Sequence, residues 1–444
     1  METPENKKYL NLVYDVWNEE TGRPIANVSN SLGDYDFRYE EGFIDFYERF
    51  YWKQLNYERF TIPRKLRRIE EVSQNPNENF YYFIKSSFDI REILTEKNMK
   101  FSNIVHETLR NCKNLFIVFL TEHESDNEEG FRLLLSYINE NSLPDNQFYL
   151  MNNNQKIDQY NIKYGSNIRY HMLNLLSHTS ASIYNGLKID FETNKKGKFF
   201  LCHNKTPKSH RYGILSLLKK HNIIDNVNWS LVPGVNRDPQ DTFTLGDIFD
   251  NELLKELEKE IQYFFEIKVK ESDYEIGRKW FDIPYQINID RSEFPELTEP
   301  AQESGGLLLP EHRETYINSY INIVTETQYK DDINVIHITE KSIRPFGFYQ
   351  IPIILATHHH VKKMKEKYGF DFFDDIVDHS YDNEPNIKKR ILLFFNEIVR
   401  LNNNKEEIIK FYSENQDRFE KNRQIMVDLA SDTSDFEFFQ KLMC

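Results

Sequence analysis

The sequence has 444 residues, of which 39% are hydrophobic and 29% are charged, so the chain is long enough for two or three domains with buried cores. Its formal net charge of −15 argues against a primary role in gripping nucleic acid, because such proteins usually carry a basic surface. The cysteines, Cys112, Cys202 and Cys444, are too scattered for a disulfide framework or a metal cage and favour a reducing compartment.

Signals for export or membrane insertion are not expected. The apolar runs fall short of the ~20 residues of a membrane span. Residues 1–10 lack the pattern of a signal peptide. We therefore expect a cytoplasmic protein without a membrane span.

The first half of the chain alternates β-rich runs with segments of helical pattern. Strands are predicted at 8–17, 80–85, 115–120 and 148–151, and helices at 91–111 and 130–141. Strands that alternate with helices imply a parallel sheet. The basic run 63–68 is expected to form a solvated helix face or, alternatively, a patch for an anionic partner.

A polar break at 194–197 separates a second region of the same kind. Strands are predicted at 198–202, 228–232, 320–324 and 351–355, and helices at 210–221, 245–267 and 361–368. A second short apolar run covers 335–338, and from 385 to 444 the pattern is almost entirely helical. The expected class is therefore α/β, with two domains and a helical C-terminal segment.

The most informative stretch is 316–355. Thr339 is a suitable helix N-cap, and Lys341 and Arg344 behind it are three residues apart, so on a helix they share a face. Two cations at a helix N-terminus suit a diphosphate, because the positive end of the helix adds to their charge. Glu340 is expected to accept hydrogen bonds from a ribose or sugar hydroxyl, and Glu326, which ends the preceding strand, to share that pocket.

A basic loop follows the 198–202 strand. Lys205 and Lys208 lie in it, and Arg211 begins the next helix. The alternative interpretation is a surface loop with solvated lysines.

A set of short motifs in the second region carries a family resemblance. The motifs are Thr339-Glu340-Lys341, Arg344-Pro345, Gly369-Phe370, Asp374-Asp375 and Ser380-Tyr381-Asp382. In this order they resemble the donor-binding domain of α-1,3-fucosyltransferases and are similar to viral and bacterial glycosyltransferase-like proteins. The resemblance covers about residues 198–390.

The resemblance implies the GT-B fold, in which two Rossmann-like domains face a cleft. Residues 1–195 would form the acceptor-side domain, 196–384 the donor-binding domain and 385–444 helices that brace the cleft. It implies a hexosyl- or fucosyltransferase-like enzyme that takes a UDP- or GDP-linked sugar as co-substrate and a glycan or protein as acceptor. The loop with Lys205, Lys208 and Arg211 would lie near the donor phosphates or near the interdomain cleft. From its cysteines and N-terminus, the protein is expected in the cytoplasm of the producing or infected cell.

The base that deprotonates the acceptor is expected after the 115–120 strand. Glu122 and Glu124 lie there, at the sheet edge where open α/β sheets bind ligands. The alternative is a solvated acidic loop.

No metal is expected in the reaction. Metal-dependent transfer needs two carboxylates directly after a buried strand. The pair Asp34 and Asp36 instead follows a Ser-Leu-Gly loop. Consecutive histidines such as 358–360 do not easily reach one ion.

Two other function classes stay open. A non-catalytic protein that keeps the fold for binding or assembly is favoured by the bulky residues Thr357-His358-His359-His360, which stand where a turn of small residues is expected. Glucosylation of nucleic acid is disfavoured by the net charge of −15.

Overall fold

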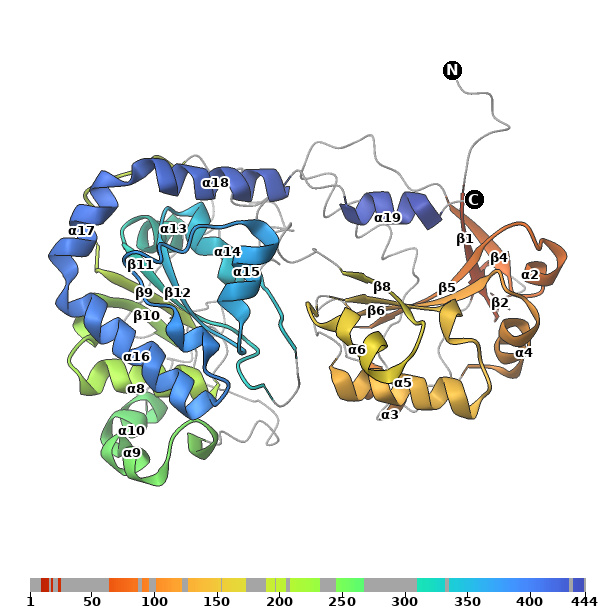
Figure 1. Ribbon diagram of the computed structural model, residues 1–444, viewed down its shortest axis with the longest axis horizontal. Coiled ribbons are helices and arrows are strands. Elements are labelled where there is room, and N and C mark those ends of the chain that lie inside the picture. The colour runs from red at the N-terminus through yellow and green to blue at the C-terminus, as the bar shows by residue number, and fades with distance from the viewer. Residues whose placement is uncertain are drawn as a thin grey trace, which may run out of the picture. The chain divides into compact units, whose positions relative to one another are not determined.

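Figure 1 shows the computed structural model of the chain, which contains two α/β units. The residues that it describes are 9–15, 17–18, 23–24, 64–86, 90–95, 101–121, 127–152, 154–172, 189–195, 197–204, 208–231, 245–266, 310–331, 335–430 and 434–442. Unit 1 is formed by Met1–Thr179, Asp332–His337 and Ser431–Cys444, and unit 2 by Ser180–Asp331 and Ile338–Ala430. The sequence predicts a boundary near residue 195, after a polar break, whereas the chain passes into unit 2 at residue 180.

Unit 1 contains a six-stranded parallel sheet in the order β4-β1-β5-β6-β7-β8. Its strands are β1 (Leu10–Tyr14), β4 (Arg64–Arg68), β5 (Phe80–Ser86), β6 (Leu115–Thr121), β7 (Phe148–Asn152) and β8 (Arg169–Met172). A separate antiparallel pair joins β2 (Trp17–Asn18) to β3 (Arg23–Pro24). The described helices are α2 (Glu71–Gln74), α3 (Ile90–Thr95), α4 (Asn103–Asn111), α5 (Glu128–Glu140), α6 (Ile157–Tyr164) and α19 (Ser434–Leu442).

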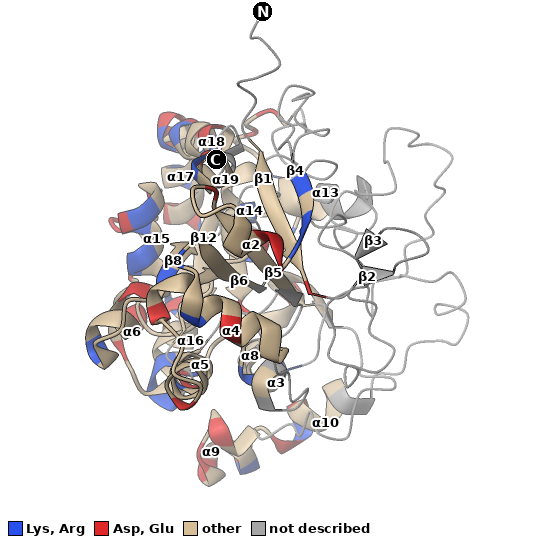
Figure 2. Cartoon of the chain, turned by 90° about the vertical axis from the view of Figure 1, so that its right-hand side faces the viewer, with Lys and Arg blue, Asp and Glu red and all other residues tan. Residues whose placement is uncertain are grey.

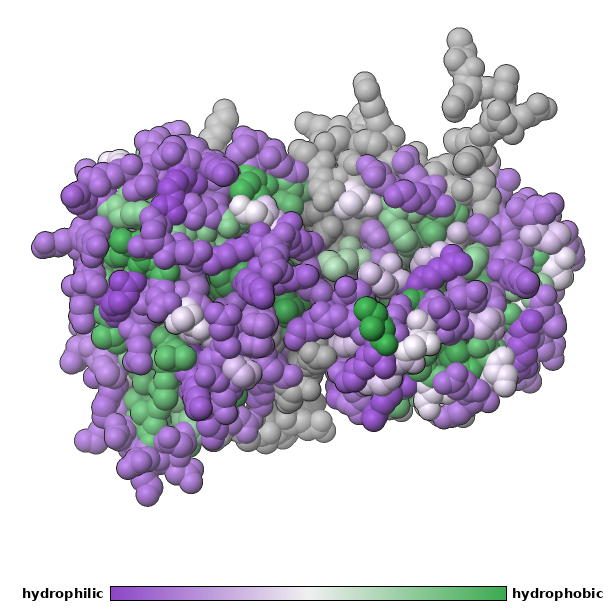
Figure 3. All heavy atoms as spheres, in the orientation of Figure 1, coloured by the Kyte–Doolittle hydropathy of each residue, from purple (hydrophilic) through white to green (hydrophobic). Residues whose placement is uncertain are grey.

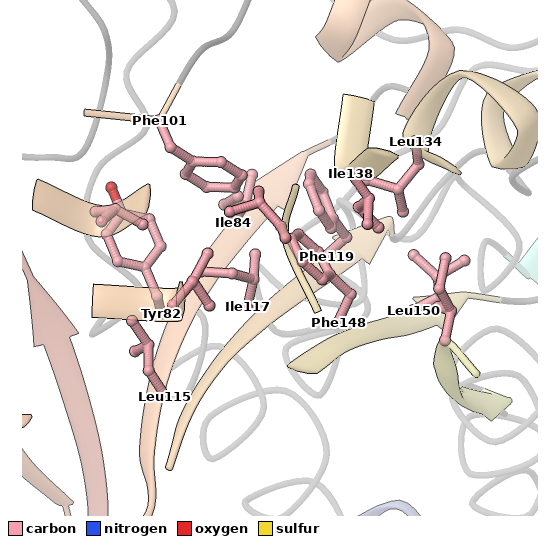
Figure 4. Packing of buried hydrophobic residues seen from close by; sticks show 14 of the residues in the cluster. Tyr82, Ile84, Phe101, Leu115, Ile117, Phe119, Leu134, Ile138, Phe148 and Leu150 are labelled. Atoms are coloured by element: carbon pink, nitrogen blue, oxygen red, sulfur yellow. The ribbon is translucent and has the colours of Figure 1, made fainter. Parts of the chain in front are cut away.

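The core of unit 1 forms because β5 and β6 are apolar on both faces. Tyr82 and Phe119 are buried on one face and belong to the same hydrophobic cluster as Leu134 and Ile138 of α5 (Figure 4). The fourth-residue spacing of the two α5 residues places them on one side of that helix. Burial of a Leu or Ile side chain contributes roughly 1.5–3 kcal/mol, so this layer stabilises the sheet.

The opposite face of this sheet meets the last helix of the chain. Phe439 of α19 stacks on Phe83 with ring centroids 6.4 Å apart, and Phe438 lies 4.0 Å from His171. The segment predicted as helical from 385 onward therefore does not stay together. Its last helix returns to unit 1, and the earlier ones belong to unit 2.

The basic run 63–68 is not a helix face, which corrects the prediction. Residues Arg64–Arg68 of it form β4, which pairs in parallel with β1 at the edge of the sheet (Figure 2). An edge strand tolerates long charged side chains, because they reach solvent and also discourage pairing with other chains. Arg67 donates from Nη1 to Glu71 at 2.8 Å and so ties the strand to α2.

Unit 2 contains a four-stranded parallel sheet in the order β10-β9-β11-β12. Its strands are β9 (Phe200–Asn204), β10 (Val227–Leu231), β11 (Ile321–Thr325) and β12 (Ile351–Leu355). Its described α-helices are α8 (Ser209–Lys220), α9 (Asn251–Glu256), α10 (Glu258–Glu266), α13 (Pro310–Ile317), α14 (Glu340–Gly347), α15 (His360–Tyr368), α16 (Ile387–Asn403), α17 (Lys405–Glu414) and α18 (Gln416–Ala430). Strands β9 and β12 start and end within two residues of the predicted runs.

Two predicted elements of the second region differ in the structure. The helix expected at 245–267 is broken, because Asp250 caps a new helix by accepting from the backbone N of Leu253 at 2.9 Å. The apolar run 335–338 is not a strand of the sheet, and it makes a single β-bridge, His337 with Asn154, within unit 1.

In both sheets the order in which successive strands are added reverses once, at a topological switch point. In unit 1 the next strands of this sheet lie on opposite sides of β1, β4 on one side and β5 on the other, and in unit 2 β10 and β11 flank β9 in the same way. Open α/β sheets bind ligands outside the carboxyl ends of their strands at such a point. Ligand sites are therefore expected at two places, the carboxyl ends of β1 and β5 and the carboxyl ends of β9 and β11.

The described surface in Figure 3 is mainly hydrophilic. Large exposed hydrophobic side chains on it are Ile162, Tyr170, Tyr263, Leu392 and Leu393. None of the helices among the described residues combines the length and apolar character that crossing a membrane requires.

Candidate functional site

The switch point of unit 2 lies between the ends of β9 and β11. Thr325, the last residue of β11, donates from Oγ1 to the side-chain oxygen of Asn204, the last residue of β9. Helix α8 begins shortly after β9, and α14 is the helix that follows β11. The polar tie between the strand ends and the two helix starts make this edge suitable for an anion.

The start of α8 is bound to the end of β11 through consecutive carbonyl groups. The carbonyl oxygens of residues 325, 326 and 327 accept hydrogen bonds from Arg211 (Nη2, 3.1 Å), His210 (Nε2, 2.9 Å) and Lys208 (Nζ, 3.4 Å), in that order. Lys208 and Arg211, which the sequence places near the phosphates, therefore lie at this edge. Arg211 is only 2% exposed.

His210 is neutral in this arrangement. Burial lowers its pKa well below 6.5, and the charges of Arg211 and Lys208 lower it further. Because a carbonyl oxygen can only accept, Nε2 carries the proton that is donated to the carbonyl of Glu326. The ring also stacks on Tyr329 with centroids 3.8 Å apart.

The Glu326 carboxylate holds the turn that leads into α14. It is fully buried and accepts from Thr339 Oγ1 at 2.8 and 2.9 Å, from Ser342 Oγ at 2.5 Å and from the backbone N of Thr327 at 3.2 Å. Burial alone would raise its pKa, but the charge of Lys341 and the Ser342 hydrogen bond are among the causes that bring the pKa below 4.5. Glu326 is thus ionised beneath the turn.

Thr339 caps α14 as the sequence predicts. Its Oγ1 accepts from the backbone N of Lys341 at 3.2 Å, and the Lys341 ammonium pairs with Glu340 at 2.8 Å. Burial would raise the pKa of Glu340, but Lys341 and Arg344 lower it to about 2. About a quarter of each side chain in the Lys341–Glu340 pair is exposed, 25% and 27%, so both groups are within reach of a ligand.

Arg344 is held more deeply than Lys341. Its Nη1 donates to the hydroxyl of Tyr316 at 2.5 Å, and its guanidinium lies 5.4 Å from the centre of that ring. Only 8% of Arg344 is exposed. Of the two cations predicted to bind a diphosphate, Lys341 is therefore the more accessible one.

Of the three consecutive histidines, two lie together and the third is buried apart from them. The backbone N of His358 donates to Asp331 at 2.7 Å, and its ring stacks on His359. His360 is fully buried, and its Nε2 lies 2.9 Å from Ser342 Oγ. Within the described ranges, no three His, Cys, Asp or Glu side chains are grouped so that they could hold a metal ion.

The remaining motifs of the resemblance have structural partners here. The Asp382 carboxylate accepts from the backbone N of Val361 at 3.1 Å and of Lys362 at 2.9 Å, which caps α15 from outside the helix. The hydroxyl of Tyr381 accepts from the backbone N of Ile354 at 3.1 Å. These hydrogen bonds hold β12, the strand before the three histidines, and α15, the helix that begins at His360.

A cavity of about 620 Å³ lies elsewhere in unit 2. It is lined by residues of α15, by 374–380, 382 and 383, and by Arg400, so the Asp374-Asp375 motif of the resemblance lies in it, whereas the residues predicted to bind the donor do not. Its charged groups are largely paired, Lys365 with Asp374 at 2.5 Å and Arg400 with Glu397. We therefore place the candidate site at the switch point, where accessible charge and helix starts coincide, and not in this cavity.

Sequence reasoning missed three participants. Ser342 and His360 complete the contacts around Glu326, and serine three residues after the cap Thr339 was the only available signal. In unit 1, Asp15 lies directly after β1 at the switch point and accepts from Tyr82 (3.1 Å) and Ser102 (2.6 Å). The predicted strand 8–17 runs past Asp15, so the pattern did not indicate that this carboxylate lies at the strand end.

Several predicted residues cannot be placed. Lys205, Glu122, Glu124 and the pair Asp34 and Asp36 lie outside the described residues. Comparison with models of known protein families and with curated proteins finds no match to this chain.

Proposed function

We propose that the chain is a glycosyltransferase that binds the diphosphate of a nucleotide-sugar at the switch point of unit 2. The observation that carries this proposal is the turn at the start of α14. It presents the partly exposed Lys341 at a capped helix N-terminus, at the carboxyl edge of a doubly wound sheet. Lys208 and Arg211 lie at the same edge and add positive charge.

The proposed reaction breaks the bond between the anomeric carbon and the diphosphate oxygen. The nucleoside diphosphate leaves with the electron pair, and the acceptor oxygen forms the new bond and loses its proton to a base. Lys341 and the α14 N-terminus stabilise the charge that builds on the leaving oxygen. The ionised, partly exposed Glu340 accepts from a ribose or sugar hydroxyl.

The proposed architecture is GT-B, with unit 1 on the acceptor side and unit 2 binding a UDP- or GDP-linked sugar. The base comes from unit 1, with Glu122 or Glu124 as the sequence-based choices and Asp15 as the choice that the fold adds. The acceptor is a glycan or a protein. A metal ion is not required in this scheme, because protein cations and a helix N-terminus neutralise the charge of the diphosphate. A cytoplasmic location is part of the proposal.

Titration calorimetry with GDP, UDP and their sugar conjugates tests the proposal. Binding of at least one diphosphate is expected, and it should weaken in Lys341→Ala. Lys389→Ala is the matched control, because Lys389, like Lys341, lies in the first turn of a helix in unit 2, and its side chain is exposed. If none of these nucleotides gives a heat of binding, the proposed donor site is wrong.

A non-catalytic binding role is the second candidate. The observation that favours it is the bulk of Thr357 to His360 directly after β12, where the resembled family is expected to have small residues. Tight nucleotide binding without hydrolysis or transfer to any glycan or protein tested would support this role.

A further inference from the structure

We propose that Glu326, Ser342 and His360 form a positioning chain that fixes the turn 339–341 for donor binding. This inference rests on the proposed function, and it gives Glu326 a role beneath the turn in place of the predicted contact with the donor pocket. None of the three residues is exposed to solvent, at 0% each. They act through Thr339 and Lys341 and do not touch the donor themselves.

The proton positions in the chain follow from the acceptors. Glu326 is ionised and can only accept, so Ser342 uses its single hydroxyl proton toward Oε1 at 2.5 Å. The Ser342 oxygen must then accept from His360 Nε2, 2.9 Å away. His360 is neutral, because burial lowers its pKa, and its proton lies on Nε2. The hydrogen bonds of the positioning chain therefore run in one direction, from His360 through Ser342 to Glu326.

The chain joins three segments that are distant in the sequence. Glu326 follows β11, Ser342 belongs to the first turn of α14, and His360 is the first residue of α15 after β12. The carboxyl ends of the neighbouring strands β11 and β12 are thus tied to one turn. That turn carries the accessible Lys341, so the position of the Lys341 ammonium relative to the sheet edge depends on these hydrogen bonds.

Thr339 transmits the constraint. Its hydroxyl donates to Glu326 and accepts from the backbone N of Lys341, so the cap and the carboxylate share one side chain. Loss of the Ser342 hydroxyl would leave the His360 proton without its acceptor and remove one donor from Glu326. The cap Thr339 would remain, so the turn should loosen without the helix being lost.

The test compares Ser342→Ala with Ser216→Ala. Ser216 is an equally buried serine of α8, and its Oγ has no hydrogen-bond partner, so the control removes a buried hydroxyl of the same kind without breaking a chain. In Ser342→Ala we expect amide exchange of residues 339–342 to accelerate and the dissociation constant of the diphosphate to rise about 10-fold. In Ser216→Ala both should stay as in the unmodified protein.

A second pair of variants covers the case in which Ser342→Ala does not fold. His360→Gln keeps an N–H donor toward Ser342, and His360→Met removes it at similar size. We expect His360→Gln to bind the diphosphate within about threefold of the unmodified protein, and His360→Met to match Ser342→Ala. The double variant should be no weaker than either single one, because both break the same chain.

The outcomes separate this inference from the proposed function. If the unmodified protein binds no nucleotide, the proposed function fails, and faster exchange at 339–342 in Ser342→Ala alone still supports the positioning chain. If the exchange of that turn is unchanged in Ser342→Ala and His360→Met, the chain does not position it and the inference is overturned. Equal diphosphate affinity in all variants would overturn its role in binding.

Discussion

The two switch points differ in the charged groups beside their strand ends, because the carboxylate of Asp15 lies in unit 1 and the cations Lys208 and Arg211 lie in unit 2. In unit 1, β1 and β5 diverge beside the carboxylate of Asp15, which accepts from the hydroxyls of Tyr82 and Ser102. In unit 2, β9 and β11 diverge beside Lys208 and Arg211, which donate to backbone carbonyls, and the same winding brings the start of α14 to the edge.

The comparison teaches that winding and chemistry are separate properties. A parallel sheet in which the strand order reverses provides a place for a ligand, whatever the amino-acid sequence of its strands. The side chains at the strand ends then decide which ligand fits, because cations and helix N-termini favour an anion and a carboxylate favours a hydroxyl or a cation. In this chain the anion site is therefore expected in unit 2 and a hydroxyl-binding group in unit 1.

The largest expected effect comes from Lys341→Ala. Loss of a cation that stabilises the leaving diphosphate should lower kcat about 100-fold, on the order of 3 kcal/mol in the barrier. Folding should change little, because the Lys341–Glu340 pair is partly exposed and such pairs contribute about 0–1 kcal/mol. Steady-state kinetics with the preferred donor and a melting curve measure the two effects.

Lys389→Ala should leave both quantities unchanged. If Lys341→Ala instead lowers the melting temperature strongly, the main role of Lys341 is to stabilise the charges of Glu340 and Glu326, and the contrast between the switch points loses its functional meaning. Normal turnover in the variant would place the donor site elsewhere.

Nucleotide binding should protect only one of the two switch points. At about 100 times the dissociation constant, a nucleoside diphosphate stabilises the folded state by roughly 2.7 kcal/mol. Amide exchange should slow around 204–211 and 326–342, and not around Asp15 or the start of α4 at Asn103. Protection at the β1–β5 switch point with none in unit 2 would reverse the comparison.

Acid should weaken unit 2 through Glu340. Its pKa is lowered from 4.5 to about 2 in the folded state, so the stabilising effect is full above about pH 4.5 and is lost as the pH falls toward 2. In Glu340→Gln the free energy of unfolding should depend less on pH in this window. Chemical unfolding at several pH values measures this, and identical slopes for both proteins would contradict the assignment.

The smallest effect is expected for Asp15→Asn. The amide keeps the shape of the carboxylate, and Asp15 belongs to the other unit, so the affinity for the diphosphate should stay within about twofold. If Asp15 is the base, turnover should nevertheless fall. Calorimetry and kinetics on the same variant separate the two. A large loss of diphosphate affinity would show that the switch points do not act separately.

Local sequence was sufficient where the hydrophobic pattern was strong. The run 115–120 reads as a buried strand and forms β6, and Thr339 reads as a helix cap and accepts from the backbone N of Lys341. Such features depend on nearest neighbours, because strand burial follows from a continuous apolar run and a cap from one side chain and the turn behind it.

Only the tertiary structure decided what the charged groups do. The basic run 63–68 became β4 because β1 offered it an edge to pair with, and Arg344 turned to Tyr316 of α13, which the spacing from Lys341 does not reveal. Glu326, Ser342 and His360 are far apart in the sequence and meet because parallel strands bring their carboxyl ends to one edge. Pairings of this kind depend on register and burial across the whole unit, which no local pattern contains.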